Sequence, residues 1–297
     1  MTGALAALAS AFCWALSAIL FRQLGEHLPA MAMNLFKGLI AVLIMGVFVF
    51  GSGSGMPLTD ALWLLLLSGL LGIFLGDTLY FLTLVRLGPR ATLLLGTLIP
   101  ISAGLIAIVL FDEIVGVLAW VGMALTLAGV SSVLWNRSEP GHGTDQWKSG
   151  IGFGLMFVLA NAGSVLLIKG GVQDLSAMQA SLVRHSAAIV ALLAWGLASS
   201  ALPNWTRPIV HDSRVRWLLI LASVLGAFLG SWLSVVALKF APAVVAVTLN
   251  STSPLFILPL AAWFLRERVS LRSVFGAIIA IVGIGLYFLS EHQGVVL

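Results

Sequence analysis

Residues with special backbone or charge behaviour recur along this chain at a constant separation of 154 positions. Generic apolar residues cannot imitate the backbone of glycine or proline, or the charge of glutamate, so shared composition does not explain the coincidence. The chain therefore contains two copies of one structural unit. The matching pairs are Trp63 with Trp217, Gly72 with Gly226, Gly76 with Gly230, Pro100 with Pro254, Glu113 with Glu267, and Gly129 with Gly283.

The composition places both copies in lipid. Of the 297 residues, 60% are hydrophobic and only 9% are charged, so a fold in water would expose more apolar surface than a soluble domain tolerates. Ten apolar segments reach the length of about 20 residues that crosses a hydrocarbon core. The sequence thus predicts an all-α integral membrane protein with ten transmembrane helices. The expected spans cover residues 3–21, 31–50, 61–82, 91–110, 117–135, 150–168, 177–199, 217–236, 243–264 and 273–290.

The sequence carries no signature of enzymatic or cofactor chemistry. Cys13 is the only cysteine, which excludes an intramolecular disulfide and a cysteine metal cluster. His-Glu-x-x-His, Gly-x-Ser-x-Gly and phosphate-binding motifs are missing, and an intramembrane aspartyl protease would need a second buried acid beside Asp77. Basic residues are scattered over short loops, so no nucleic acid is expected as a partner. We expect no enzyme, no cofactor and no metal.

The expected spans divide evenly around a polar linker at residues 136–149. We expect a first repeat at 1–135 and a second repeat at 150–290. Because each repeat has an odd number of spans, the second enters the membrane in the inverted orientation. Eleven of the 15 Lys and Arg residues follow odd-numbered spans and only Lys169 and Lys239 lie on the other side. The positive-inside rule therefore predicts extracytoplasmic N- and C-termini.

A second separation, of 147 positions, aligns the first two spans of each repeat. It pairs Arg22 with Lys169 and Lys37 with Arg184. Lys37 and Arg184 lie inside apolar spans, where a cation is costly. Lys37 fits a structural anchor that reaches the headgroups, whereas Arg184 fits an anchor or a functional group equally well.

These features resemble the EamA unit of the drug/metabolite transporter superfamily. The unit has a glycine-rich third span, a proline within the fourth, a short acidic loop and a glycine-bearing fifth span; here the loop reads Phe111-Asp112-Glu113 and again Leu265-Arg266-Glu267. Two such units form the ten-helix bacterial exporter type. The resemblance implies export or exchange of amino acids, other metabolites or drugs across a bacterial inner membrane. It also implies a central cavity lined by spans 1, 3, 4, 6, 8 and 9.

Polar and aromatic residues on those spans are the candidate substrate-binding residues. A mostly apolar pocket with a few oriented polar groups suits a small amphipathic solute. The tryptophans could instead face lipid at the membrane interface. The candidates are Trp14, Ser17, Asp77, Tyr80, Asn161, Ser164, Trp232, Asn250 and Ser253.

Asp77 and the matched prolines each have two interpretations. An ionised Asp77 is costly in hydrocarbon, so it should face the bundle interior, pair with a cation or take up a proton. It could couple transport to protons or act as a structural carboxyl. Pro100 and Pro254 remove helical hydrogen bonds and could form hinges or plain structural kinks. The glycine pairs favour close helix packing, and Glu113 and Glu267 favour helix capping.

The sequence therefore predicts a secondary transporter that works by alternating access through a central cavity between the repeats. No nucleotide-binding motif is present that could drive a pump. The alternative is a membrane-embedded ligand-sensing scaffold without net transport. The small-molecule substrate, the coupling ion and the oligomeric state are not encoded in any motif.

Overall fold

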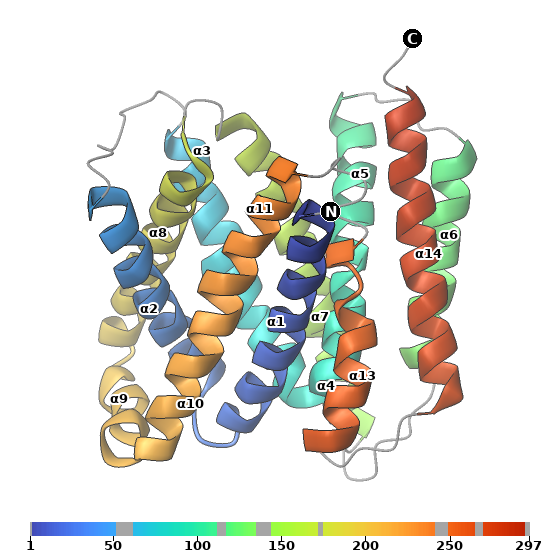
Figure 1. Cartoon of the computed structure of the whole chain (residues 1–297). Coiled ribbons are helices and arrows are strands. Elements are labelled where there is room, and N and C mark those ends of the chain that lie inside the picture. The colour runs from blue at the N-terminus through green and yellow to red at the C-terminus, as the bar shows by residue number, and fades with distance from the viewer. Residues whose placement is uncertain are drawn as a thin grey trace.

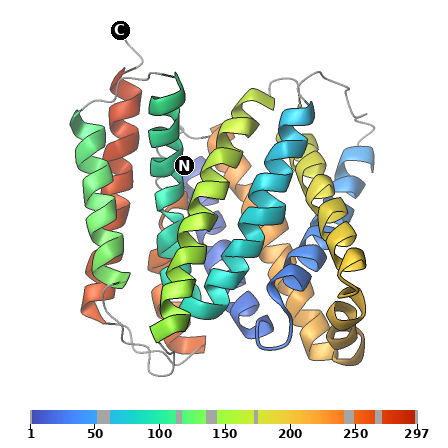
Figure 2. The same ribbon diagram turned by 180° about the vertical axis from the view of Figure 1, so that it is seen from behind.

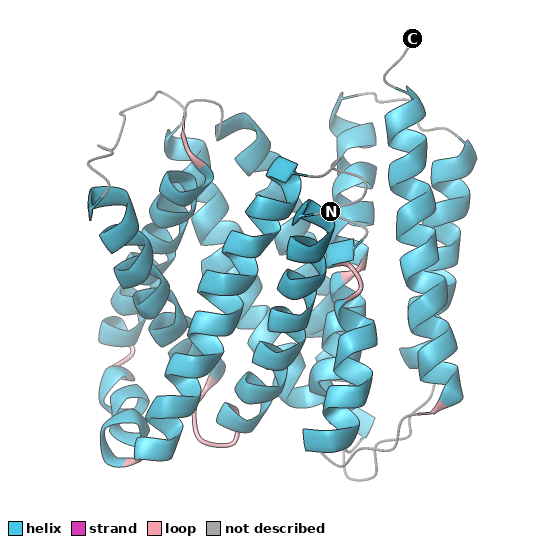
Figure 3. Cartoon of the chain, viewed as in Figure 1, coloured by secondary structure: helices cyan, strands magenta, loops and turns pink. Residues whose placement is uncertain are grey.

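The computed structural model describes residues 2–51, 62–111, 117–134, 144–171, 175–240, 249–264 and 270–294. Within these ranges all regular structure is helical (Figure 3). The capping predictions for Glu113 and Glu267 and most of the linker at 136–149 lie outside the described residues.

The first half of the chain forms a series of long apolar helices. Their apolar composition agrees with that of the expected spans, because few polar side chains interrupt them. The third span begins as an α-helix and continues as a π-helix, and the fourth is divided near its middle. The elements are α1 (Thr2–Leu24), α2 (Ala30–Gly51), α3 (Leu62–Ser68), η1 (Gly69–Asp77), α4 (Thr78–Gly96), α5 (Leu98–Phe111) and α6 (Val117–Leu134).

The second half follows a related order with one added helix. Asp212 caps the helix that follows this addition, since its side chain accepts hydrogen bonds from the amides of Arg214 and Val215. The elements are α7 (Thr144–Gly171), α8 (Ala177–Ala198), α9 (Leu202–His211), α10 (Ser213–Ser223), η2 (Val224–Gly230), α11 (Ser231–Phe240), α13 (Ser253–Phe264) and α14 (Leu271–Gly294).

Six of the described helical segments are long and apolar enough to cross a membrane. Shorter apolar helices cover Trp120–Ser132, Ser253–Phe264 and Leu271–Tyr287. Large apolar side chains are exposed along the outer surfaces of these helices, as lipid-facing positions require. The chain is therefore a multi-pass helical membrane protein. The six segments are Thr2–Leu24, Ala30–Gly51, Leu62–Gly96, Asp145–Ile168, Met178–Ala198 and Ser213–Ser234.

Helices of the two halves interleave. The first helix, α1, packs against α10, η2, α11 and α13 of the second half, and it crosses the front of the bundle in Figure 1. The corresponding helix, α7, packs against α3, η1, α4 and α5 of the first half and lies in the foreground of Figure 2, which shows the bundle from behind. The remaining helices pair across the halves as α2 with α8 and α6 with α14. The core is thus built jointly by both halves.

Two local features depart from the expected spans. The helices of the third and fourth spans meet at a kink at Gly88, with no loop between them. The φ of 78° and ψ of 168° at Gly88 suit glycine, and Pro89 follows it directly. The expected loop around residues 203–216 instead contains α9, whose Trp205 is buried. Pro203 lies in the first turn of this helix, where a missing amide proton costs nothing.

Candidate functional site

The two π-helical segments occupy matching positions in the two halves. Positions Leu70 to Gly76 of η1 correspond to Val224 to Gly230 of η2 at the separation of 154 residues. Each π-helix contains the glycine pair that the sequence singles out, Gly72 with Gly76 and Gly226 with Gly230. π-Helical turns are rare and gather at functional sites. Their repetition directs attention to the contacts around these glycines.

The glycines admit matching side chains from the first helix of the other half. Ser164 of α7 lies against Gly72, and Ser17 of α1 lies against Gly226. Ser164 Oγ donates to the carbonyl of Ser68, and Ser17 Oγ donates to the carbonyl of Ala222, each at 2.8 Å. Ser17 and Ser164 correspond at the separation of 147 residues. The same hydrogen bond is therefore made twice, once in each direction between the halves.

A second pair of contacts lies one helical turn further along. A Cβ at Gly76 would lie 2.5 Å from Nδ2 of Asn161, and a Cβ at Gly230 would lie 2.5 Å from Nε1 of Trp14. Trp14 and Asn161 also correspond at the separation of 147 residues. No side chain fits at either glycine unless its neighbour moves. The glycines therefore allow α1 and α7 to approach the π-helices closely.

A third contact joins α6 and α14, which run side by side in Figure 1. Gly122 faces Gly283 and Gly129 faces Gly276, so the two helices are antiparallel. Thr126 Oγ1 reaches the carbonyl of Ala280, its own counterpart at the separation of 154 residues, at 3.2 Å.

The fourth and ninth expected spans are both interrupted beside the matched prolines. In the first half α4 ends at Gly96 and α5 begins at Leu98, with Thr97 as a turn and Pro100 in the first turn of α5. In the second half a turn at residues 251–252 precedes α13, and Pro254 is the second residue of that helix. The prolines therefore follow breaks in the helices, where a proline is tolerated.

The helix breaks line a cavity of about 690 Å³ between the halves. This volume is within the range of small-molecule sites. Gly96, Thr97 and Ile99 line it from the first half, and their counterparts Asn250, Ser251 and Ser253 line it from the second. Non-helical backbone at membrane depth is tolerated where it borders such a cavity.

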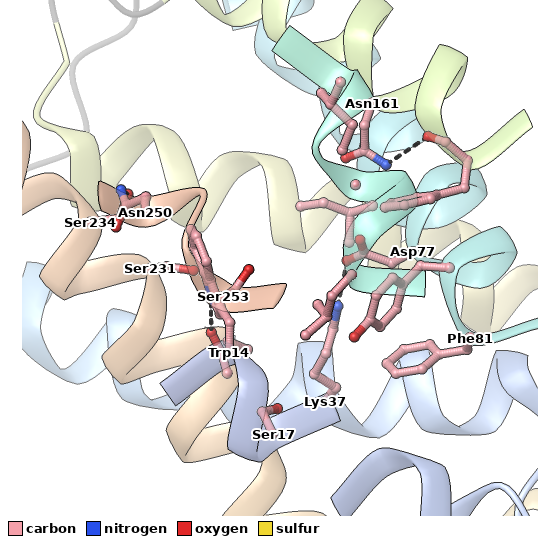
Figure 4. A pocket seen from close by; sticks show the side chains of 18 of the residues that line it. Trp14, Ser17, Lys37, Asp77, Phe81, Asn161, Ser231, Ser234, Asn250 and Ser253 are labelled. Atoms are coloured by element: carbon pink, nitrogen blue, oxygen red, sulfur yellow. Dashed lines mark hydrogen bonds and ion pairs between the residues drawn. The ribbon is translucent and has the colours of Figure 1, made fainter. Parts of the chain in front are cut away.

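One side of the cavity, the charged wall, contains Lys37, Asp77, Tyr80, Phe81 and Arg184. Lys37 Nζ forms an ion pair with Asp77 Oδ2 and also lies 5.3 Å from the ring centre of Phe81 (Figure 4). The pairing partly offsets the cost of placing both charges in a low-dielectric region. Of the alternatives that the sequence leaves for Asp77, the structure therefore shows pairing with a cation.

The opposite side, the hydroxyl wall, contains mainly serine side chains and one amide. Figure 4 shows it facing the charged wall. Asn250 Nδ2 donates to Ser234 Oγ at 2.8 Å, and Trp14 Nε1 donates to the carbonyl of Gly226 at 3.2 Å. These groups are neutral hydrogen-bond donors and acceptors. The hydroxyl wall consists of Trp14, Ser17, Ser231, Ser234, Asn250 and Ser253.

Seven of the nine candidate substrate-binding residues line the cavity. Ser164 is buried behind it and hydrogen-bonds to Ser68 and Arg184. Trp232 is not among the lining residues and is 46% exposed. The lining candidates are Trp14, Ser17, Asp77, Tyr80, Asn161, Asn250 and Ser253.

Three charged or titratable residues that line the cavity were not among the candidate substrate-binding residues. Lys37, Arg184 and His185 all lie on the second helices of the two halves, which the family resemblance does not place at the cavity. The signal that could have revealed them is the match of Lys37 with Arg184. Among the residues that the structure describes, no cluster of His, Cys, Asp and Glu has the size of a metal site.

Comparison with known proteins gives consistent results. The EamA-like transporter family matches residues 1–135 and again residues 148–289. A relative from Archaeoglobus fulgidus described as an uncharacterized transporter is 26% identical over 293 residues, which cover 97% of this chain and 99% of the relative. A protein of known crystal structure is 13% identical and aligns over 98% of each chain with a TM-score of 0.64, which shows a shared fold.

Proposed function

This chain belongs to the EamA-like transporter family, and we propose that it is a secondary transporter of small amphipathic solutes. The observation that carries the proposal is the cavity of about 690 Å³ lined at corresponding positions by both halves. Its lining combines apolar and aromatic surface with a few oriented polar groups, which suits amino acids, other metabolites or drugs. In this proposal the protein exports or exchanges these solutes, and it is not an enzyme.

The proposed architecture is ten transmembrane helices in two inverted repeats, at residues 1–135 and 150–290, joined by a linker. The antiparallel packing of α6 with α14 supports this arrangement, since Thr126 meets its own counterpart Ala280, and Gly122 and Gly129 each face the counterpart of the other. The reciprocal Ser17 and Ser164 hydrogen bonds support it independently. Both are the contacts expected around a pseudo-two-fold axis in the membrane plane.

In the proposed alternating-access cycle, the broken helices beside Pro100 and Pro254 change their bend while the glycine-packed helices move as units. The breaks already lack regular hydrogen bonding and border the cavity, so bending there disrupts little else. Asp77 is the candidate group for proton coupling, because protonation would release Lys37 from its ion pair.

We place the protein in the bacterial inner membrane with both termini extracytoplasmic. The excess of Lys and Arg after the odd-numbered spans supports this orientation. Arg22 Nη1 donates to the carbonyl of Val85 at 2.5 Å. This hydrogen bond places the connections after the first and third spans, which both carry basic residues, at the same end of the bundle. Labelling with an impermeant thiol reagent in intact cells tests it. Glu26→Cys in a Cys13→Ser background should not be labelled, because the reagent does not reach the cytoplasmic side. Labelling of this cysteine would show that the orientation is the opposite of the proposed one.

Solute flux into proteoliposomes tests the function. Purified protein is reconstituted and screened with amino acids, amphipathic cations and sugars, and protein-free liposomes provide the background. Saturable uptake above that background is expected for at least one class. Saturable binding without flux for a ligand that reaches the cavity would instead identify a ligand-sensing scaffold.

A further inference from the structure

Arg184 is a cation that lines the cavity. The second half has no acidic residue at the position that would correspond to its ion-pair partner. Its counterpart Lys37 pairs with Asp77, but the counterpart of Asp77 in the second half is Ser231. No described carboxylate forms an ion pair with Arg184. The described lining of the cavity therefore contains two cations, Lys37 and Arg184, and one acid, Asp77.

The side chains that accept hydrogen bonds from the Arg184 guanidinium orient it and carry no charge. Nε donates to Ser68 Oγ at 3.0 Å, and Nη2 donates to Ser164 Oγ at 3.2 Å. Both hydroxyl protons are already given to backbone carbonyls, of Leu65 and Ser68 respectively. The absence of a side chain at Gly72 leaves space beside Nη2, because a Cβ there would be only 3.5 Å away. Arg184 is thus held in one position by neutral groups.

The bonding leaves part of the guanidinium available. A guanidinium has five N–H donors in a fixed plane, and two are used by Ser68 and Ser164. Both terminal nitrogens retain a hydrogen for an acceptor, which is the edge that binds a carboxylate through two parallel hydrogen bonds. An arginine without a counter-ion is costly at membrane depth, so an anion bound here would recover much of that cost.

The charge balance favours an anion with a single charge. The described lining contains Lys37 and Arg184 against Asp77, which leaves one excess positive charge. A doubly charged phosphate would meet the negative Asp77 with excess charge of the same sign. Phe157, Val165 and Ile168 of α7 provide apolar surface in the same cavity for the body of a solute.

We propose that Arg184 binds a carboxylate group of the solute, so that the cavity selects carboxylate-bearing amphipathic molecules over their neutral and cationic analogues. The proposal deepens the proposed transport function and rests on it only for the step across the membrane. The hydroxyl wall then faces the other end of the solute and accepts uncharged polar groups. Arg184 sets specificity by direct contact, and Ser68 and Ser164 are its positioning residues.

Equilibrium binding to purified wild-type protein tests the proposal without a variant. The probes are 3-phenylpropionate, its neutral isostere 3-phenylpropionamide, and phenethylammonium, followed by the same sets on indole and isobutyl bodies. The carboxylate should bind about tenfold or more tightly than the amide, since a charge-assisted pair replaces a neutral contact. Equal binding of acid and amide, or no binding of any of the acids, overturns the proposal.

Three variants locate the preference. Arg184→Gln should abolish the preference for the acid, whereas Arg184→Lys should keep part of it because the charge remains without the planar fork. Arg214→Gln is the control, since Arg214 is exposed and is not among the residues that line the cavity. A preference that persists in folded Arg184→Gln protein contradicts the assignment. If that variant does not fold, folded Arg184→Lys must bind the acid at least severalfold more weakly than wild type, or the assignment fails.

Flux measurements with the same probes separate this proposal from the proposed function. Acids that bind selectively but do not cross the membrane support the role of Arg184 and count against transport. Probes that cross with no preference for the acid support transport and overturn the role of Arg184.

Discussion

The charged wall and the hydroxyl wall of the cavity are built from corresponding segments but present different chemistry. Asp77 ends η1 and Tyr80 follows it in the first half, and Ser231 and Ser234 take the corresponding positions after η2 in the second. The matched glycines Gly72 and Gly76 of η1, by contrast, recur as Gly226 and Gly230 of η2. Backbone approach thus requires identical residues in both copies, whereas the groups that face the cavity differ between them.

This difference gives the cavity a direction. A symmetric lining would place equal groups at both ends of a bound solute. Here one end offers charged side chains and the other offers neutral hydroxyl, amide and indole groups (Figure 4). An amphipathic solute therefore has one preferred orientation between the walls. Substitutions at several positions test this difference between the two walls, and their expected effects differ in size.

The largest effect is expected from Lys37→Met on the charged wall. The substitution leaves Asp77 without its counter-ion and should destabilise the protein by about 3 kcal/mol. Thermal unfolding in detergent measures the change. The double variant Lys37→Met with Asp77→Leu should regain most of the loss, because the unpaired charge is gone. No change in the unfolding midpoint of the single variant would show that the pair is not a structural requirement.

The matched glycines should respond equally in the two halves. Gly76→Ala and Gly230→Ala each insert a methyl group against the α1 or α7 side chain and should cost about 2 kcal/mol. Gly46→Ala is the control because a Cβ there meets no atom within 4 Å. The folded fraction is followed by size-exclusion chromatography and thermal unfolding. Tolerance in one half alone would mean that the two π-helices do not have the same packing role.

The matched prolines test the helix breaks. Pro100→Ala and Pro254→Ala each restore an amide proton that can bridge the break, which should stiffen the helix and slow transport about fivefold, or ~1 kcal/mol in barrier height. Folded yield should be unchanged. Initial rates in proteoliposomes provide the measurement. Wild-type rates in both single variants and in the double variant would reduce the prolines to structural kinks.

The smallest effect is expected at Ser231, the counterpart of Asp77. No hydrogen bond from its side chain is among those that the structure describes, so Ser231→Ala should change the free energy of unfolding by no more than about 0.5 kcal/mol. The same unfolding assay applies. A loss as large as that in Lys37→Met would show that the two walls are structurally equivalent despite their different side chains.

The sequence predicts the helical membrane fold because long apolar segments and repeated glycines and prolines are local signals. It also places Trp14, Asp77, Asn161 and Asn250 at the cavity through the family resemblance. It does not predict that Lys37 pairs with Asp77, because the residues belong to different spans and meet only when α2 packs beside η1. Contacts between helices depend on rotation and depth, which a hydropathy pattern does not specify.

Other features escape prediction for local reasons. The π-helices differ from α-helices only in hydrogen-bond register, and an apolar sequence contains no marker for that change. Helix α9 contains Pro203 and Pro208, which in sequence indicate a loop, although the first occupies a helix start and Trp205 anchors the segment. The kink at Gly88 lies between the third and fourth expected spans, where the flanking residues continue as helix on both sides.

The central claim is that the cavity opens alternately to the two sides of the membrane. The accessibility of cysteines at corresponding positions of the cavity lining tests it most directly. Ile99→Cys and Ser253→Cys, in a Cys13→Ser background, place thiols at corresponding positions of the two halves. An impermeant thiol reagent is added to one side or the other of oriented vesicles, with and without a transported solute. The account predicts that each cysteine is reached from both sides and that the solute slows both reactions. Reaction from one side only, unaffected by solute, would contradict it.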